Sequence, residues 1–124
     1  MSKTFEDRTG AKVTVALNES TQAYEVSLAD GTVAGSAFFL PGSGGDDVRI
    51  FHHTVVDKEF GGRGLATILV AEALEDSRAR GVTVVPVCSL FVKKLAETGD
   101  DYLAQGGLFR KATGADLDIV KEQV

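Results

Sequence analysis

The pattern of apolar residues changes near Gly61, and this change is the strongest constraint on the fold. Before Gly61, polar and apolar residues alternate in short segments, as strands with one buried face require. After Gly61, apolar residues recur at every third or fourth position, which is the period of an amphipathic helix. The sequence therefore predicts a first half made of strands and a second half in which helices and strands follow one another.

The alternating segments predict an antiparallel sheet. Residues 12–17 and 24–28 alternate, and Asp30-Gly31 is a typical hairpin turn before a third strand over residues 33–40. Residues 41–47 are rich in glycine and acidic side chains, so we expect a surface loop there instead of more strand.

The next segments predict a parallel strand–helix–strand crossover. Residues 48–56 are rich in β-branched and aromatic side chains, which favour a long inner strand. Residues 64–80 predict an amphipathic helix that ends at Gly81. Residues 82–87 are almost continuously apolar, as in a strand that is covered on both faces and lies beside a parallel neighbour.

The remaining chain predicts two more helices. Ser89 is an expected N-cap for a helix that ends at residue 96 or 97. The tail after Gly107 has one helical pattern over residues 116–124. In that pattern the apolar side chains spaced to pack against the rest of the protein are Leu117, Val120 and Val124.

Composition limits the classes of function. The 124 residues, 44% of them hydrophobic and 25% charged, suit one folded domain over residues 1–124. A net charge of -5 disfavours nucleic acid and membrane surfaces as partners. The first twenty residues are too polar for a signal peptide and no apolar run spans a bilayer, so we expect a cytoplasmic protein. Cys88, the single cysteine, and the two histidines have no zinc-site spacing, so we expect no metal.

The segment 60–66 is the strongest candidate binding motif, because it has glycine at three of four successive positions, Gly61, Gly62 and Gly64. A glycine-rich loop that opens a helix presents several N–H groups at the positive end of the helix dipole, which suits a phosphate or pyrophosphate. Arg63 adds a positive charge. From the glycines alone, a plain strand-to-helix turn that binds no ligand remains an open alternative. The Walker pattern fails because Gly-Lys-Ser/Thr is absent, and the dinucleotide pattern fails because Thr67 stands where a glycine is needed.

The loop resembles the Arg/Gln-x-x-Gly-x-Gly/Ala loop of the GNAT N-acetyltransferase superfamily. Gly64 and Ala66 occupy its last two fixed positions, while Gly61 stands where the family has a long side chain. The chain is similar to the short, single-domain, YjdJ-like branch in having His53-Thr54 before the loop, and Pro86 and Cys88 near the end of the next strand. The resemblance covers about residues 5–103 and leaves 108–124 as an appended tail.

The resemblance implies a single α/β domain with a mixed, mostly antiparallel sheet, a parallel crossover and two central strands that splay apart at Pro86. Acetyl-CoA, as cosubstrate, would lie in that opening. The implied cofactor-binding residues are the loop residues Gly61, Gly62, Arg63, Gly64, Leu65 and Ala66 for the pyrophosphate, together with Thr54, Val55, Val56 and Phe91.

Cys88 and His53 are the candidate catalytic residues. Cys88 lies where a strand ends and a helix begins, and could either accept the acetyl group as a thiolate or form a wall of the acyl pocket. His53, matched by the family's His-Thr pair, is the candidate general base, although a carboxylate or an ordered water is an alternative. His52 faces the opposite side of the strand. The expected acceptor is an amine, either a cationic small molecule or a peptide.

Two other functions remain open from the sequence. One is a non-catalytic acyl-CoA-binding module, and the other is a cysteine hydrolase that uses Cys88 with a histidine. For the coenzyme loop, we expect Gly64→Glu to abolish binding and to leave the fold intact.

Overall fold

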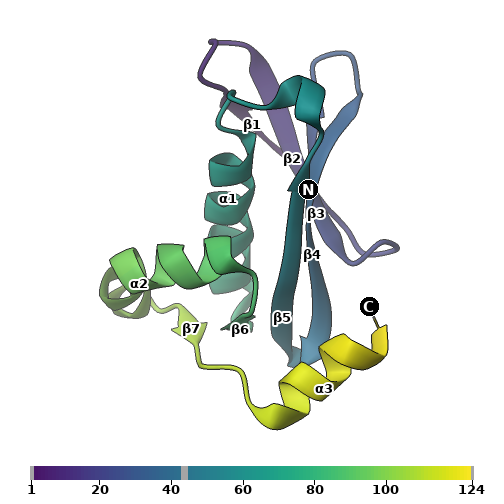
Figure 1. Ribbon diagram of the computed structural model, residues 1–124. Helices are drawn as coiled ribbons and strands as arrows, with labels where there is room; N and C mark the ends of the chain where they lie inside the picture. Colours follow the sequence, from purple (N-terminus) through teal and green to yellow (C-terminus); the bar gives the residue numbers. More distant parts are fainter. Residues whose placement is uncertain (1, 43–44, 124) are drawn as a thin grey trace. The chain divides into compact units, whose positions relative to one another are not determined.

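The computed structural model describes residues 2–42 and 45–123 (Figure 1). The first half consists of β1 (Ser2–Glu6), β2 (Lys12–Asn18), β3 (Ala23–Leu28), β4 (Val33–Gly42) and β5 (Gly45–Val56). The second half consists of the 3₁₀ turn η1 (Lys58–Phe60), α1 (Leu65–Arg80), β6 (Thr83–Pro86), α2 (Ser89–Ala104), β7 (Leu108–Phe109) and α3 (Gly114–Gln123). None of the helices in these ranges combines the length and the apolar character needed to cross a membrane.

The strands form one mixed sheet in the order β1-β2-β3-β4-β5-β6-β7. The pairs β1–β2, β2–β3 and β3–β4 are antiparallel, whereas β6 runs parallel to both β5 and β7. Because α1 connects β5 to β6, the predicted parallel crossover is present. The expected α/β class with a mixed sheet is confirmed.

Two compact units can be distinguished in the chain, Met1–Phe38 with Thr54–Ala73, and Phe39–His53 with Leu74–Val124. Both units contain buried apolar side chains. In the first unit, the large side chains that are almost completely buried include Val13, Tyr24, Val26, Leu65 and Leu69. In the second unit, they include Ile50, Phe51, Val84, Val85 and Phe91.

The ladder between β5 and β6 ends at Pro86, the residue at which the two strands were expected to splay apart. The last pair in register is Phe51 with Pro86. The N–H groups of Val87 and Cys88 then both donate to the carbonyl oxygen of Phe51, at 3.0 and 2.8 Å. Proline has no N–H with which to continue a ladder, so β6 ends there while β5 continues to Val56.

The expected loop over residues 41–47 is wrong in length. Strand β4 continues through Pro41 to Gly42, and β5 already begins at Gly45, while residues 43–44 lie outside the described part. A Cβ on Gly42 would overlap Cγ1 of Val48, so this glycine permits a close approach within the sheet. The sequence pattern predicts that glycine ends the strand here, whereas packing within the sheet requires a glycine at position 42.

Helix α2 does not end at residue 96 or 97 but extends to Ala104. Gly99 lies inside this helix. A Cβ at this position would be 2.8 Å from Cζ of Phe109, so the packing of Phe109 requires a glycine here. Further along, the buried hydroxyl of Tyr102 donates to the carbonyl oxygen of Leu74 at 2.9 Å, and burial raises the pKa of Tyr102 to about 12. Tertiary packing therefore outweighs the low helix propensity of glycine.

The C-terminal helix is confirmed, but it begins earlier than expected. Thr113 and Asp116 form a capping box, in which the Asp116 carboxylate accepts from the N–H and the hydroxyl of Thr113 at 2.8 and 3.0 Å. The expected packing of Leu117 is wrong, because its side chain is 42% exposed. Val124 lies outside the described residues. The short strands β1 and β7 were not predicted.

Candidate functional site

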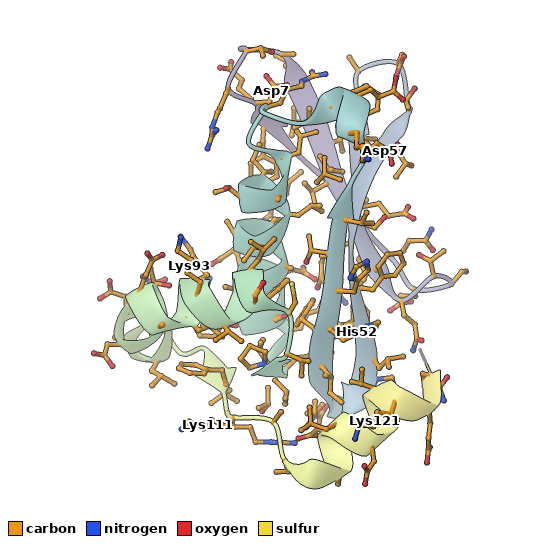
Figure 2. The ribbon with its side chains drawn as sticks, in the orientation of Figure 1. Asp7, His52, Asp57, Lys93, Lys111 and Lys121 are labelled. Atoms are coloured by element: carbon orange, nitrogen blue, oxygen red, sulfur yellow. The ribbon has the colours of Figure 1, made fainter. Side chains whose placement is uncertain are left out.

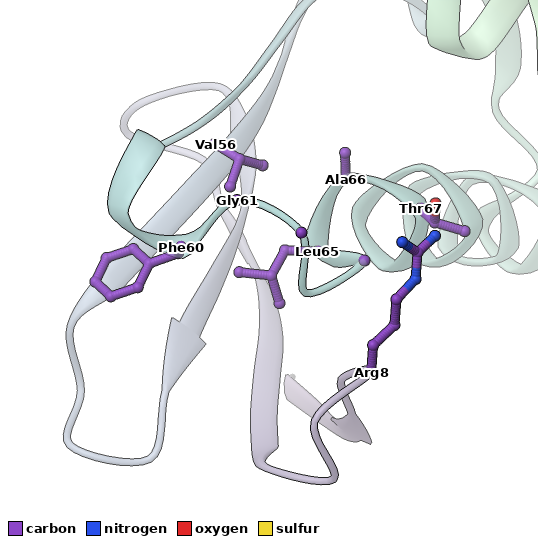
Figure 3. Close-up of a pocket in the computed structure, with 9 residues that line it drawn as sticks. Arg8, Val56, Phe60, Gly61, Leu65, Ala66 and Thr67 are labelled. Carbon is purple, nitrogen blue, oxygen red and sulfur yellow. The ribbon is translucent and has the colours of Figure 1, made fainter.

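An open pocket of about 300 Å³ lies within the first unit, where the segment after β5 leads into α1 (Figure 3). This volume is at the lower end for small-molecule sites, so the pocket would accept one part of a large ligand. The residues that line it are Arg8, Val56, Phe60, Gly61, Gly62, Gly64, Leu65, Ala66 and Thr67.

The loop before α1 requires glycine at two positions. Gly62 and Gly64 have φ angles of +79° and +77°, which residues with a side chain rarely adopt. Gly61 has an ordinary φ of -64°. A side chain at Gly64 would therefore strain the backbone, so the expected Gly64→Glu substitution does not isolate ligand binding from folding.

The N-terminus of α1 presents unused donors to the pocket. The first bond of the helix runs from the N–H of Ile68 to the carbonyl oxygen of Gly64, at 3.2 Å. Within residues 2–42 and 45–123, no acceptor takes the N–H groups of Leu65, Ala66 and Thr67. Three N–H groups at the positive end of a helix dipole form a favourable site for an anion.

Arg63, the expected charged contact, is held by an aspartate. Its Nε donates to Oδ2 of Asp7 at 2.6 Å, and the Asp7 carboxylate is completely buried. The hydroxyl of Thr9, the guanidinium of Arg63 and the N–H groups of Thr9 and Ala11 lower the pKa of Asp7 to about 2, against the opposing effect of burial. The positive charge of Arg63 is thus already balanced inside the protein.

This pair predicts a pH-dependent contribution to stability. The pKa of Asp7 falls from 3.8 to about 2 on folding, so its contribution is fully present above pH 3.8 and is lost as the pH falls toward 2. At neutral pH we expect Asp7→Asn to lower the melting temperature by roughly 5 °C. The difference from wild type should close as the pH approaches 2.

Thermal unfolding of both proteins at a series of pH values measures this difference. Asp100→Asn, at an exposed position of α2, removes the same charge outside the Asp7 cluster and serves as the control. A difference between wild type and Asp7→Asn that stays constant down to pH 2 would contradict the role of the Asp7 carboxylate.

Arg8 lies where Arg63 was expected. Its N–H donates to the carbonyl oxygen of Arg63 at 2.9 Å, and its side chain extends toward the first turn of α1 (Figure 3). A Cβ on Gly64 would be 3.1 Å from Nε of Arg8 and 3.2 Å from its Cγ, so the side chain lies across this glycine.

A second group of candidate residues lies in the second unit, around the end of the β5–β6 ladder. Cys88, not Ser89, occupies the N-cap of α2, makes no side-chain capping bond and is half-buried. Its N–H donates to the carbonyl oxygen of Phe51, two residues before His53 on the same strand. Residues two apart on a strand share a face, and Phe51 stacks on Phe91 of α2 at 4.4 Å between ring centroids. His53 therefore projects from the face of β5 on which α2 packs.

His52 projects from the other face of β5 (Figure 2). It is half-buried, whereas His53 is exposed. Burial, together with the neighbouring His53, lowers the pKa of His52, so this imidazole resists protonation. The alternation supports His53 over His52 as the histidine that shares a face with Cys88.

The family model of the GCN5-related N-acetyl-transferases matches residues 23–105, which is more than half of the chain. The chain belongs to this N-acetyltransferase family. The matched segment contains the glycine loop, His53 and Cys88, whereas Asp7, Arg8 and α3 lie outside it.

A solved structure supports the same acetyltransferase fold. The solution structure of a GCN5-like protein from Staphylococcus aureus superposes with a TM-score of 0.51 at 18% sequence identity. The match covers 81% of this chain and 90% of that one. No curated protein sequence matches the chain.

In this member of the family, the structure brings together most of the expected cofactor-binding residues. The pocket is lined by Val56 and by the loop residues other than Arg63, while Thr54 and the 43% exposed Val55 precede it on β5. Phe91 does not fit the expected role, because its ring is completely buried against Phe51. We assign Phe91 to the core.

Two residues that line the pocket, Arg8 and Thr67, were missed by sequence reasoning, while Phe60 lay in the predicted segment 60–66 but was not assigned to cofactor binding. Thr67 directly follows that segment, so extending the motif by one residue finds it. Arg8 has no such signal, because it approaches from a turn more than fifty residues earlier. Among the described residues, no group of three or more His, Cys, Asp or Glu side chains is placed to hold a metal ion.

Proposed function

We propose that this chain is an acetyl-CoA-dependent N-acetyltransferase that transfers the acetyl group to an amine. The observation that carries the proposal is the pocket at the start of α1, where the glycine loop and three unused N–H groups face one concave site. Its chemistry suits a diphosphate, and coenzyme A contains one. Family membership supplies the reaction class.

In this proposal, the loop and the first turn of α1 hold the diphosphate of the coenzyme. The pantetheine arm follows the end of β5, at Thr54, Val55 and Val56. The end of the β5–β6 ladder supports this path, because β5 continues past its last paired residue, Phe51, to Val56.

The proposed chemistry is nucleophilic attack by a neutral amine on the thioester carbonyl carbon. A carbon–nitrogen bond forms, the carbon–sulfur bond breaks, and coenzyme A leaves as a thiolate that then takes up a proton. His53 accepts the proton that the ammonium form of the acceptor must lose, directly or through a water molecule. Its exposure on β5 supports this role, since an acceptor amine must reach it.

Cys88 has two possible places in this reaction. In direct transfer it borders the acyl group. In the two-step route its thiolate attacks the thioester, releases coenzyme A and carries the acetyl group until the amine takes it. Its half-buried position at the N-cap of α2 is compatible with either route.

The proposed acceptor is a cationic amine, as a small molecule or on a peptide. The net charge of -5 attracts such a molecule, and the short connection between β2 and β3, residues 19–22, leaves little chain to cover an acceptor site. A lone cysteine fits a reducing compartment such as the cytoplasm, which is the proposed location.

A calorimetric titration with acetyl-CoA tests the proposal. We expect saturable one-to-one binding in the micromolar range, as is usual for enzyme substrates. NADH, which shares the adenine and the pyrophosphate, should bind at least tenfold more weakly. If millimolar acetyl-CoA produces no binding, the proposal fails, as does the reading of the chain as a non-catalytic acyl-CoA module.

A further inference from the structure

We propose that Arg8, in the turn between β1 and β2, is the cationic residue that contacts the diphosphate of the coenzyme. This inference rests on the function proposed above and assigns to Arg8 the contact that the sequence suggested for Arg63.

Charge at the pocket supports this assignment. Among the described residues that line the pocket, Arg8 alone carries a formal charge. Arg63 does not line it, and its guanidinium is committed to the buried Asp7 carboxylate at 2.6 Å. Within residues 2–42 and 45–123, Arg8 forms no ion pair. Its guanidinium, with a planar set of N–H donors, matches the oxygens of a phosphate group.

The turn that carries Arg8 is fixed to the glycine loop by two bonds through Arg63. The side chain of Arg63 holds Asp7 at 2.6 Å, and its carbonyl oxygen accepts from the N–H of Arg8 at 2.9 Å. The turn is also closed internally, because the N–H of Asp7 donates to the carbonyl oxygen of Ala11 at 2.9 Å. The backbone of Arg8 is therefore already ordered by these bonds when the protein folds. Ligand binding would not have to supply the conformational entropy of ordering it.

Gly64 lets the Arg8 side chain lie close to the backbone of the loop. The side chain crosses the Cα of Gly64, where a Cβ would lie 3.1 to 3.5 Å from its Nε, Cγ and Cδ atoms. From there it extends toward the first turn of α1 (Figure 3). The N–H groups of Leu65, Ala66 and Thr67 in that turn would bind the same anion as Arg8. Gly64 therefore has two roles: it adopts a left-handed backbone conformation, and it leaves space for the Arg8 side chain.

Binding of coenzyme A and of 3′-dephospho-coenzyme A to wild type and to Arg8→Ala tests the proposal. A charged hydrogen bond to phosphate predicts a loss of about tenfold or more. Because both ligands keep the diphosphate, Arg8→Ala should weaken both by the same factor. Arg8→Lys should recover part of the affinity, since it keeps the charge but not the planar donor set.

Lys12→Ala is the matched control, because it removes one positive charge from an exposed position on the same β1–β2 hairpin and does not line the pocket. We expect this variant to bind both ligands as wild type does. Affinities of Arg8→Ala within twofold of wild type would overturn the proposal. So would a loss seen with coenzyme A alone, which would place Arg8 at the 3′-phosphate. If wild type itself bound neither ligand, the proposed function would fail, and that result differs from both of these.

Discussion

Ala66→Glu is expected to weaken acetyl-CoA binding by about 100-fold or more, because it places a carboxylate where the diphosphate should lie. Ala66 lines the pocket in the first turn of α1. Juxtaposed like charges in a binding site cost several kcal/mol, and about 2.8 kcal/mol corresponds to 100-fold. Glutamate suits the first turn of a helix, so the fold should tolerate this substitution better than Gly64→Glu.

Ala71→Glu is the matched control, since it adds the same charge to the same helix at an exposed position outside the pocket. We expect its affinity for acetyl-CoA to remain within about twofold of wild type, since an exposed charge away from the site is screened by salt. Calorimetry measures both affinities, and circular dichroism verifies the folds. Equal affinity of Ala66→Glu and Ala71→Glu would remove the start of α1 from the coenzyme site.

His53→Gln is expected to lower the rate of acetyl transfer by about 100-fold or more near neutral pH, which is the usual contribution of a general base. The physical reason is that a cationic acceptor must lose a proton before it can attack. An alkyl ammonium group ionises near pH 10, so at higher pH the free amine no longer needs a base. The deficit of His53→Gln should therefore shrink as the pH rises from 7 toward 10.

Release of coenzyme A thiol measures this rate, with spermidine and a lysine-containing peptide as acceptor probes. His52→Gln, the neighbouring residue on the opposite face of β5, is the control and should keep a rate close to that of wild type. A deficit of His53→Gln that does not change with pH would contradict the role of base. If both His53→Gln and Cys88→Ala retained the wild-type rate, these side chains would have no part in the chemistry.

Strands β2, β3, β4, β5 and β6 and helix α1 could be predicted in outline, because their local patterns agree with the tertiary structure. The turn at Asp30-Gly31 is confirmed by the φ of +91° at Gly31, and the end of α1 by the φ of +71° at Gly81. The full length of α2 could not be predicted, because Gly99 is tolerated only through its contact with Phe109. That contact joins α2 to β7 and leaves no trace in the helical pattern of α2 itself.

The same distinction applies to the site. The glycine loop and its place before α1 were evident from residues 60–66 alone. The proposed exchange of roles between Arg63 and Arg8 could not be predicted, because it depends on the buried Asp7, whose carboxylate pairs with Arg63. No spacing rule links a turn near residue 8 to a loop near residue 63.

The most direct test of the central claim is a titration of uniformly ¹⁵N-labelled protein with coenzyme A, followed by the amide chemical shifts of each residue. If the coenzyme diphosphate binds at the start of α1, the largest shifts will fall on the amides of Gly62, Gly64, Leu65, Ala66 and Thr67. Unchanged amides in this segment at saturating ligand, with shifts elsewhere in the chain, would contradict the claim.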